Sequence, residues 1–128
     1  MPAKIRAIVI DDSAFNRQTI SAMMESAGDI EVVGEAGTAE AALARIPALM
    51  PDVAVLDARL PDGSGIDVGR ALSKQLPVIA LSGYGREQDR ARSAEAGFVA
   101  HLVKPADFDT LQSLIASIQT GIKRPAAS

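Results

Sequence analysis

Five short apolar runs, separated by helix-like segments, constrain the fold of this 128-residue chain more than any other feature. A short apolar run between turn signals is typical of a strand that is buried on both faces of a parallel sheet. The runs cover residues 5–10, 30–35, 53–56, 77–81 and 99–103. Strands that alternate with helices favour a parallel sheet with helices on both faces and right-handed crossovers. The sequence therefore predicts one α/β domain with a five-stranded parallel sheet.

Five helices are expected between and after these strands, at residues 14–27, 39–46, 64–74, 86–96 and 107–120. Ser13, Thr38 and Asp107 have side chains that cap a helix N-terminus, and Gly97 suits a C-cap. Because proline lacks the backbone N–H and crowds the preceding turn, Pro47 is expected to end or kink the second helix. Apolar residues at helical spacing predict one apolar face for the last helix, formed by Leu111, Leu114, Ile115 and Ile118.

Composition excludes several classes of protein. The formal net charge is −3 and there is no cysteine, which argues against a basic nucleic-acid-binding surface, disulfides and cysteine-ligated metals. No apolar run approaches the roughly 20 residues that span a bilayer, and the N-terminus does not resemble a signal peptide. We therefore expect a cytoplasmic protein with no membrane and no direct nucleic-acid partner. A monomer or a weak dimer is also expected.

Polar side chains follow four of the five apolar runs at the point where each run ends. Because parallel strands all point the same way, these ends share one edge of the sheet, where ligands of open α/β sheets bind. The residues are Asp11, Asp12, Asp57, Ser82 and Lys104. Three carboxylates placed together repel one another unless a cation joins them, and Mg²⁺ prefers such oxygen ligands. The sequence therefore predicts a magnesium site at this edge.

The same edge carries groups that suit a phosphoryl group. Lys104 is not a ligand for the same metal, but its ammonium suits a phosphoryl oxygen, and Ser82 can donate to a second oxygen. The backbone N–H groups of Ala58 and Gly83 can donate to others. Aspartate forms acyl phosphates as a covalent nucleophile, and Asp57 is the candidate nucleophile because it ends the central run.

Four segments together resemble the bacterial response-regulator (CheY-like) receiver domain: I-V-I-D-D-S at 8–13, V-L-D-A-R-L-P-D-G-S-G at 55–65, A-L-S-G-Y-G at 80–85 and L-V-K-P at 102–105. They occur in the family's order and spacing and cover nearly the whole chain. The resemblance implies a flavodoxin-like, three-layer αβα fold with strand order 2-1-3-4-5. It also implies a two-component or phosphorelay phosphoacceptor. Such a protein takes phosphate from a sensor histidine kinase or a histidine phosphotransfer protein onto Asp57 and controls a downstream protein.

The resemblance implies a role for each acidic residue of the site. Asp12 and Asp57 would bind Mg²⁺ directly, together with the backbone carbonyl of Arg59. Asp11 would act mainly through water. The metal would thus be held by two strand ends and by the loop that follows the second of them.

The resemblance also implies the residues on the phosphoryl side. Ser82 and Lys104 would contact the phosphoryl group, and the family usually has a cis peptide before the proline, here Lys104–Pro105. Phosphorylation would draw Ser82 inward and remodel the face of the fourth helix, fifth strand and fifth helix. His101 falls where the family usually carries the aromatic residue that turns inward on activation. Either it takes that role, which would make activation pH-sensitive, or it is a half-exposed strand residue.

Arg59 and Tyr84 lie two residues beyond Asp57 and Ser82. In this family these two positions flank the approach of the hydrolytic water and tune the lifetime of the acyl phosphate. Both side chains are large, so we expect slow self-dephosphorylation. The alternative is that both side chains point to solvent.

Phe15, at the start of the first helix, has two interpretations. It could dock a phosphotransfer domain of a kinase. Alternatively it packs in the core, as aromatic residues at helical spacing commonly do. The spacing in question is that of Phe15, Thr19, Ala22 and Met23.

Residues 1–121 are expected to form the receiver domain and residues 122–128 a flexible tail, with no output domain in this chain. The chain is then a stand-alone regulator, a relay intermediate or a domain of a longer protein.

Its first third resembles receivers of chemotaxis methylesterases, its middle those of helix-turn-helix regulators and its last third those of hybrid kinases. It is not expected to be a turnover enzyme. Two alternatives are an interaction module that never takes phosphate and a haloacid-dehalogenase-type phosphatase, although the latter needs D-x-D where residues 11–13 read D-D-S.

Overall fold

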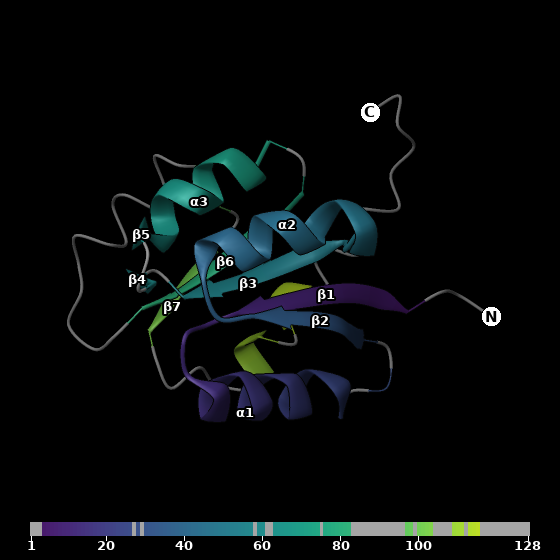
Figure 1. The fold of residues 1–128 in the computed structure, drawn as a ribbon. Helices are drawn as coiled ribbons and strands as arrows, with labels where there is room; N and C mark the ends of the chain where they lie inside the picture. Colours follow the sequence, from purple (N-terminus) through teal and green to yellow (C-terminus); the bar gives the residue numbers. More distant parts are fainter. Residues whose placement is uncertain are drawn as a thin grey trace.

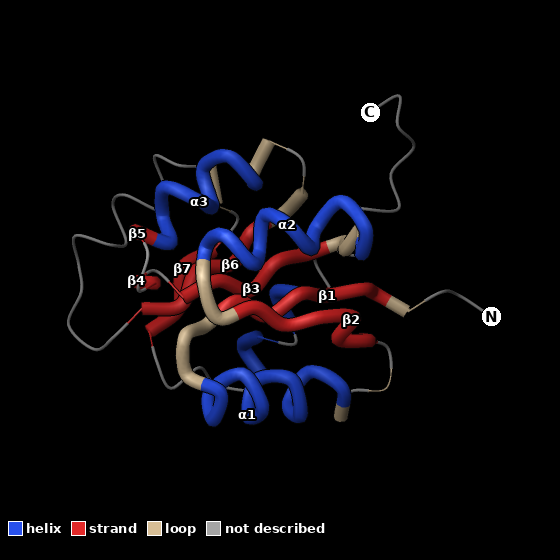
Figure 2. The backbone as a smooth tube through the Cα atoms, in the orientation of Figure 1, coloured by secondary structure: helices blue, strands red, loops and turns tan. Residues whose placement is uncertain are grey.

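A five-stranded parallel sheet lies between two layers of helices (Figures 1 and 2). The computed structural model describes residues 4–26, 28, 30–57, 59–60, 63–74, 76–82, 97–98, 100–103, 109–111 and 113–115. The strands of the sheet are β1 (Ile5–Ile10), β2 (Ile30–Ala36), β3 (Val53–Asp57), β6 (Val78–Ser82) and β7 (Ala100–Val103). Their order, β2-β1-β3-β6-β7, confirms the expected order 2-1-3-4-5.

The helices divide between the two faces of the sheet. α1 (Ala14–Glu25) lies on one face, and α2 (Ala39–Leu49) and α3 (Gly65–Leu72) lie on the other (Figure 1). Residues 109–111 and 113–115 are also helical, and Leu111 and Ile115 are buried in the same core as α1. After β3, the structure has a short antiparallel pair, β4 (Arg59–Leu60) and β5 (Gly63–Ser64), which is not among the strands expected from the sequence.

Successive residues of the central strands enter opposite cores, because side chains alternate along a strand. In β1, Val9 belongs to the core that contains Met24 of α1, whereas Ile10 belongs to the core that contains Ile46 of α2. Burial of both faces explains why these strands are apolar without polar alternation. Packing in both cores therefore holds β1 up to Ile10 and β3 up to Leu56, directly before Asp11 and Asp57.

The buried face of α1 is not the one that the apolar spacing indicated. Ile20 and Met24 are buried against the sheet, whereas Phe15 is 75% exposed and Thr19 is also exposed. Core packing of Phe15 is thus the wrong alternative. The larger aliphatic residues set the rotation of the helix, since the face that buries most apolar area turns inward.

Pro47 does not end α2, which continues to Leu49. The N–H of Met50 still donates to the carbonyl of Ile46 at 2.8 Å, and Met50 ends the helix in the left-handed region at φ 48°. A proline in the last turn removes only one hydrogen bond of the helix. The buried side chain of Ile46 holds that turn against the sheet.

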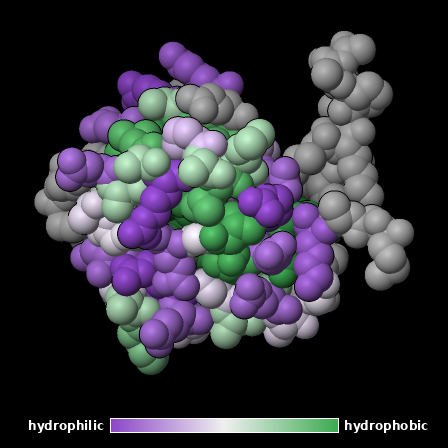
Figure 3. Space-filling view, turned by 45° about the vertical axis from the view of Figure 1, so that its right-hand side comes forward, coloured by the Kyte–Doolittle hydropathy of each residue, from purple (hydrophilic) through white to green (hydrophobic). Residues whose placement is uncertain are grey.

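The strand boundaries agree with the prediction to within one residue. The predicted fourth helix (86–96), the segments 104–108 and 116–121, and the tail 122–128 lie outside the described residues. Among the described helices, none has the length and apolar character required to cross a bilayer. The large apolar side chains exposed in the described part are Phe15, Leu43 and Met50, and the face drawn in Figure 3 shows apolar area bordered by hydrophilic residues.

Candidate functional site

Three carboxylates meet at the carboxyl edge of the sheet. Ile10 of β1 pairs with Leu56 of β3, so the residues that follow them, Asp11 and Asp57, lie at the same level of neighbouring strands. One carboxylate oxygen from each of Asp11, Asp12 and Asp57 lies within 4.8 Å of the other two. Asp11 and Asp57 are buried, whereas Asp12 is exposed, so the cluster opens to solvent on the side of Asp12. The structure thus brings together the acidic residues that the sequence assigned to one site.

The donor set of this cluster fits Mg²⁺. The ion prefers oxygen ligands, commonly uses one or two carboxylates and keeps several of its waters. Two of the carboxylates are buried and one is exposed, which supplies charged ligands while leaving a solvent side for bound water. Like charges this close repel one another, and a divalent cation offsets that repulsion. Asp11, Asp12 and Asp57 are therefore the residues of the described part that could hold the ion.

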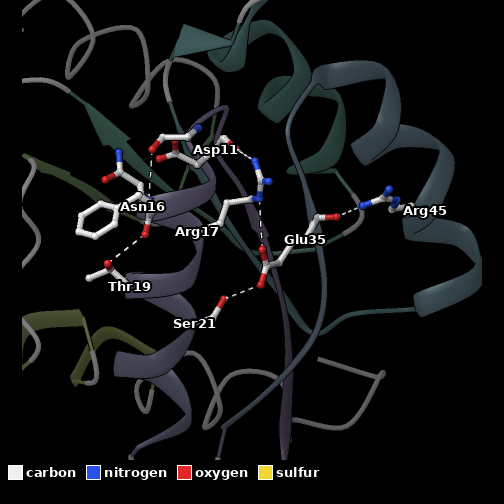
Figure 4. Close-up of polar contacts among 9 residues, drawn as sticks. Asp11, Asn16, Arg17, Thr19, Ser21, Glu35 and Arg45 are labelled. Carbon is white, nitrogen blue, oxygen red and sulfur yellow. Dashed lines mark hydrogen bonds and ion pairs between the residues drawn. The ribbon is translucent and has the colours of Figure 1, made fainter.

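Asp11 is held through its N–H, its side chain and its carbonyl. Its N–H donates to the carbonyl of Ala36 at 3.0 Å, its Oδ1 accepts from the N–H of Ser13 at 2.9 Å, and its carbonyl accepts from Nη1 of Arg17 at 2.6 Å (Figure 4). Ser13 is also the N-cap of α1, where its Oγ accepts from the N–H of Asn16 at 3.2 Å. The link between β1 and α1 is therefore fixed around the acidic pair.

Arg17 and Glu35 form an ion pair beside the cluster. The distance from Nε to Oε1 is 3.2 Å, and the side chains are 21% and 38% exposed. Ser21 of α1 donates to the other oxygen of Glu35 at 3.3 Å, and Arg45 of α2 donates to its backbone carbonyl (Figure 4). The sequence reasoning missed this network. The available signal was a carboxylate near the end of the apolar run that forms β2.

The backbone register brings a further predicted residue to the same edge. Asp57 pairs with Leu81 of β6, so Ser82 is the next residue on the strand beside it, and Ser82 pairs with Val103 of β7. The structure describes the backbone of Arg59 in β4 and of His101 in β7. Five predicted site residues lie outside the described part of the chain: Ala58, Gly83, Tyr84, Lys104 and Pro105.

A separate hollow lies at the opposite edge of the sheet, near the amino ends of β3 and β6. Its lining residues are Ile46, Pro47, Met50, Pro51, Asp52 and Leu76. Most of these side chains are apolar, and none belongs to the carboxylate cluster. The carboxyl edge therefore remains the candidate site for charged chemistry.

Comparisons with known proteins identify close relatives. The family model of the response regulator receiver domain matches residues 7–116. The DNA-binding transcriptional activator DevR/DosR of Mycobacterium tuberculosis is 36% identical over 103 residues, which cover 78% of this chain and 48% of that protein. A protein-glutamate methylesterase/protein-glutamine glutaminase of Caulobacter vibrioides is 40% identical over 126 residues, 94% of this chain and 36% of that protein.

A solved structure of a receiver domain is also similar to this chain. The signal receiver domain of NarL from Mycobacterium tuberculosis has a TM-score of 0.84 and 30% identity, covering 94% of this chain and 99% of that chain. By contrast, the chain spans only 48% and 36% of the two curated relatives named above. The similarity to those two proteins therefore concerns one part of each.

Proposed function

The chain belongs to the response regulator receiver domain family, and from this premise we propose that it is the phosphoacceptor of a two-component or phosphorelay system. Asp57 takes a phosphoryl group from the phosphohistidine of a sensor histidine kinase or of a histidine phosphotransfer protein. The observation that carries the proposal is the cluster of Asp11, Asp12 and Asp57, whose oxygens lie within 4.8 Å of one another.

Asp57 is the proposed nucleophile for two reasons. It ends β3, the middle strand of the sheet, whereas Asp11 and Asp12 are adjacent and suit a metal pair. An oxygen of Asp57 attacks phosphorus, the P–N bond to the donor histidine breaks, and its electron pair stays on the imidazole. The product is an acyl phosphate.

Asp12, Asp57 and the carbonyl of Arg59 are the proposed direct ligands of Mg²⁺, with Asp11 acting through water. When bound, the ion supplies neutralisation of charge on the carboxylates and on the phosphoryl oxygens. The burial of Asp11 and Asp57 supports this role, because buried carboxylates need a compensating charge.

Lys104, Ser82 and the backbone N–H groups of Ala58 and Gly83 are proposed to hold the phosphoryl oxygens. The register of β3, β6 and β7, which puts Ser82 next to the partner of Asp57, supports this arrangement. The peptide between Lys104 and Pro105 is proposed to be cis, as is usual in the family.

The output is proposed to be a change of surface that a downstream protein reads. Ser82 moves towards the phosphoryl group, and the face of the fourth helix, β7 and the last helix is remodelled with it. His101 is a candidate second element of this switch, and Arg59 and Tyr84 are candidates for slowing hydrolysis. The chain's own chemistry is then its phosphorylation and dephosphorylation rather than turnover of a substrate.

Phe15 is proposed to contact the phosphodonor protein. It lies at the start of α1, shortly after the acidic pair, and is 75% exposed. A large apolar side chain that stays at the surface beside a reactive site suits a protein contact, since aromatic residues often carry interface energy.

Intact mass after incubation with Mg²⁺ and a small-molecule phosphodonor tests the proposal. We expect one added phosphoryl group in the wild-type chain and none in Asp57→Asn, which keeps the size of the side chain. Omitting Mg²⁺ should slow the reaction strongly in the wild type. An adduct that persists in Asp57→Asn would place the acceptor elsewhere.

The same preparation separates the alternatives. Binding of Mg²⁺ without any adduct, from small donors or from phosphorylated histidine phosphotransfer proteins, would favour an interaction module that never takes phosphate. Steady hydrolysis of a phosphate monoester such as p-nitrophenyl phosphate would favour a phosphatase. Either result would overturn the proposed phosphoacceptor role.

A further inference from the structure

The guanidinium of Arg17 bridges the carboxylate of Glu35 and the backbone carbonyl of Asp11, a residue of the acidic cluster. Its Nε lies 3.2 Å from Oε1 of Glu35, and its Nη1 donates to the carbonyl of Asp11 at 2.6 Å (Figure 4). The carboxylate of Glu35 is not one of the three in the cluster. Neither Arg17 nor Glu35 has a role in the chemistry proposed above. The hydrogen bond from Arg17 to the carbonyl of Asp11 nevertheless connects this pair to the cluster.

The carbonyl that Arg17 binds belongs to the peptide group between Asp11 and Asp12. Because a peptide group is planar, turning this carbonyl also moves the nitrogen of Asp12. The N–H and the Oδ1 of Asp11 are already engaged by Ala36 and Ser13. The bond from Arg17 therefore restrains the orientation of the peptide leading into Asp12.

Glu35 fixes the direction of that bond. A guanidinium is planar and presents its donors in a rigid fork, so an acceptor on one edge orients the N–H groups of the others. Ser21 donates to the second oxygen of Glu35 at 3.3 Å, which keeps the carboxylate in place. Gly37 leaves room for the guanidinium, because a Cβ there would lie 3.1 Å from Nη1 of Arg17.

We propose that Arg17 is a positioning residue of the metal site and that Glu35 acts through it. Arg17 holds the peptide between Asp11 and Asp12 in the orientation that presents both carboxylates to the ion. This inference rests on the proposed function, since it concerns the Mg²⁺ that the phosphorylation chemistry needs. Loss of a residue that orients metal ligands commonly weakens metal affinity about 10- to 100-fold. For this part-exposed pair we expect the lower end, about 10-fold.

The test is the dissociation constant of Mg²⁺, measured by NMR titration of the full chain without phosphodonor. Positioning and simple charge predict opposite signs for Arg17→Ala. Removing a nearby positive charge should tighten binding of a cation, whereas loss of positioning should weaken it. We expect weaker binding in Arg17→Ala, and weaker binding in Arg17→Lys as well, because lysine keeps the charge but not the fork.

Glu35→Ala should also weaken Mg²⁺ binding, and the double variant Arg17→Ala/Glu35→Ala should be no weaker than Arg17→Ala alone. That lack of additivity is expected if Glu35 acts only through Arg17. Arg45→Ala is the matched control, since it also removes an arginine of this network but one whose hydrogen bond goes to the backbone carbonyl of Glu35. The dissociation constant of Mg²⁺ for Arg45→Ala should equal that for the wild type.

Unchanged or tighter Mg²⁺ binding in both Arg17 variants, with the wild type binding normally, would overturn this inference and leave the proposed function standing. A wild-type chain that binds no Mg²⁺ would overturn both. If Arg17→Ala does not fold, as judged by its amide spectrum, Arg17→Lys alone decides: weaker Mg²⁺ binding supports positioning, and unchanged binding, which a simple charge effect predicts because lysine keeps the charge, overturns it.

Discussion

Asp57 lies level with Asp11, which follows the neighbouring parallel strand, and the two residues are only 7% and 1% exposed. Two buried carboxylates with a third beside them repel one another when no cation is present. The packing of β1 and β3 holds them together regardless, because the apolar residues before them are buried in both cores. The site is therefore built at some cost to the stability of the metal-free protein.

We predict that Mg²⁺ raises the unfolding temperature of the wild-type chain, because the ion binds the assembled carboxylates and not the unfolded chain. At 100 times the dissociation constant the gain is about 2.7 kcal/mol. Calorimetric scans with and without Mg²⁺ measure it. Asp57→Asn should raise the unfolding temperature of the metal-free protein and reduce the shift caused by Mg²⁺. An equal shift in wild type and variant would contradict the prediction.

Phe15→Ala should leave the free energy of unfolding within about 0.5 kcal/mol of the wild-type value, as is usual for exposed positions. Ile20→Ala on the same helix should cost about 2–5 kcal/mol, because Ile20 is 7% exposed and packs in the core. Urea unfolding compares the two variants. If Phe15 is the contact for the donor, Phe15→Ala should slow phosphorylation by a phosphotransfer protein but not by a small-molecule donor.

Gly69→Ala should destabilise the fold by about 1–3 kcal/mol, the usual cost of overpacking a core. A Cβ at Gly69 would overlap the ring of Phe98 and lie 2.8 Å from Cδ2 of Leu56. Combining it with Phe98→Leu should recover part of the loss relative to Phe98→Leu alone. Thermal unfolding of the three variants and the wild type is the measurement, and a strictly additive result would contradict direct contact.

Tyr84→Ala should shorten the lifetime of the phosphorylated protein, because a smaller side chain opens the approach of water to the acyl phosphate. The decay of the phosphorylated mass with time measures this lifetime. Leu43→Ala is a suitable control, since Leu43 is a half-exposed residue of α2. An unchanged half-life in Tyr84→Ala would support the alternative that Tyr84 points to solvent.

The sheet was predictable because each strand buries both faces, which leaves a continuous apolar run in the sequence. The meeting of Asp11, Asp12 and Asp57 at one edge was equally predictable, since parallel strands end at one edge. The orientation of α1 was not, because Phe15 and Ile20 are both apolar and helical spacing alone does not say which face turns inward. The length of α2 was missed for a related reason: the burial of Ile46, not local propensity, carries the helix past Pro47.

By itself, the amino-acid sequence determined the strands, their order through the family resemblance, and the acidic residues of the candidate site. These features depend on local apolar runs and on the polar residue that ends each one. Only the tertiary structure decided which residues form hydrogen bonds around that site. The partners Arg17 and Glu35 are 18 positions apart and lie on different elements, so they meet only when α1 packs beside β2. Such a contact leaves no periodic pattern in the chain, because it is made by packing rather than by local structure.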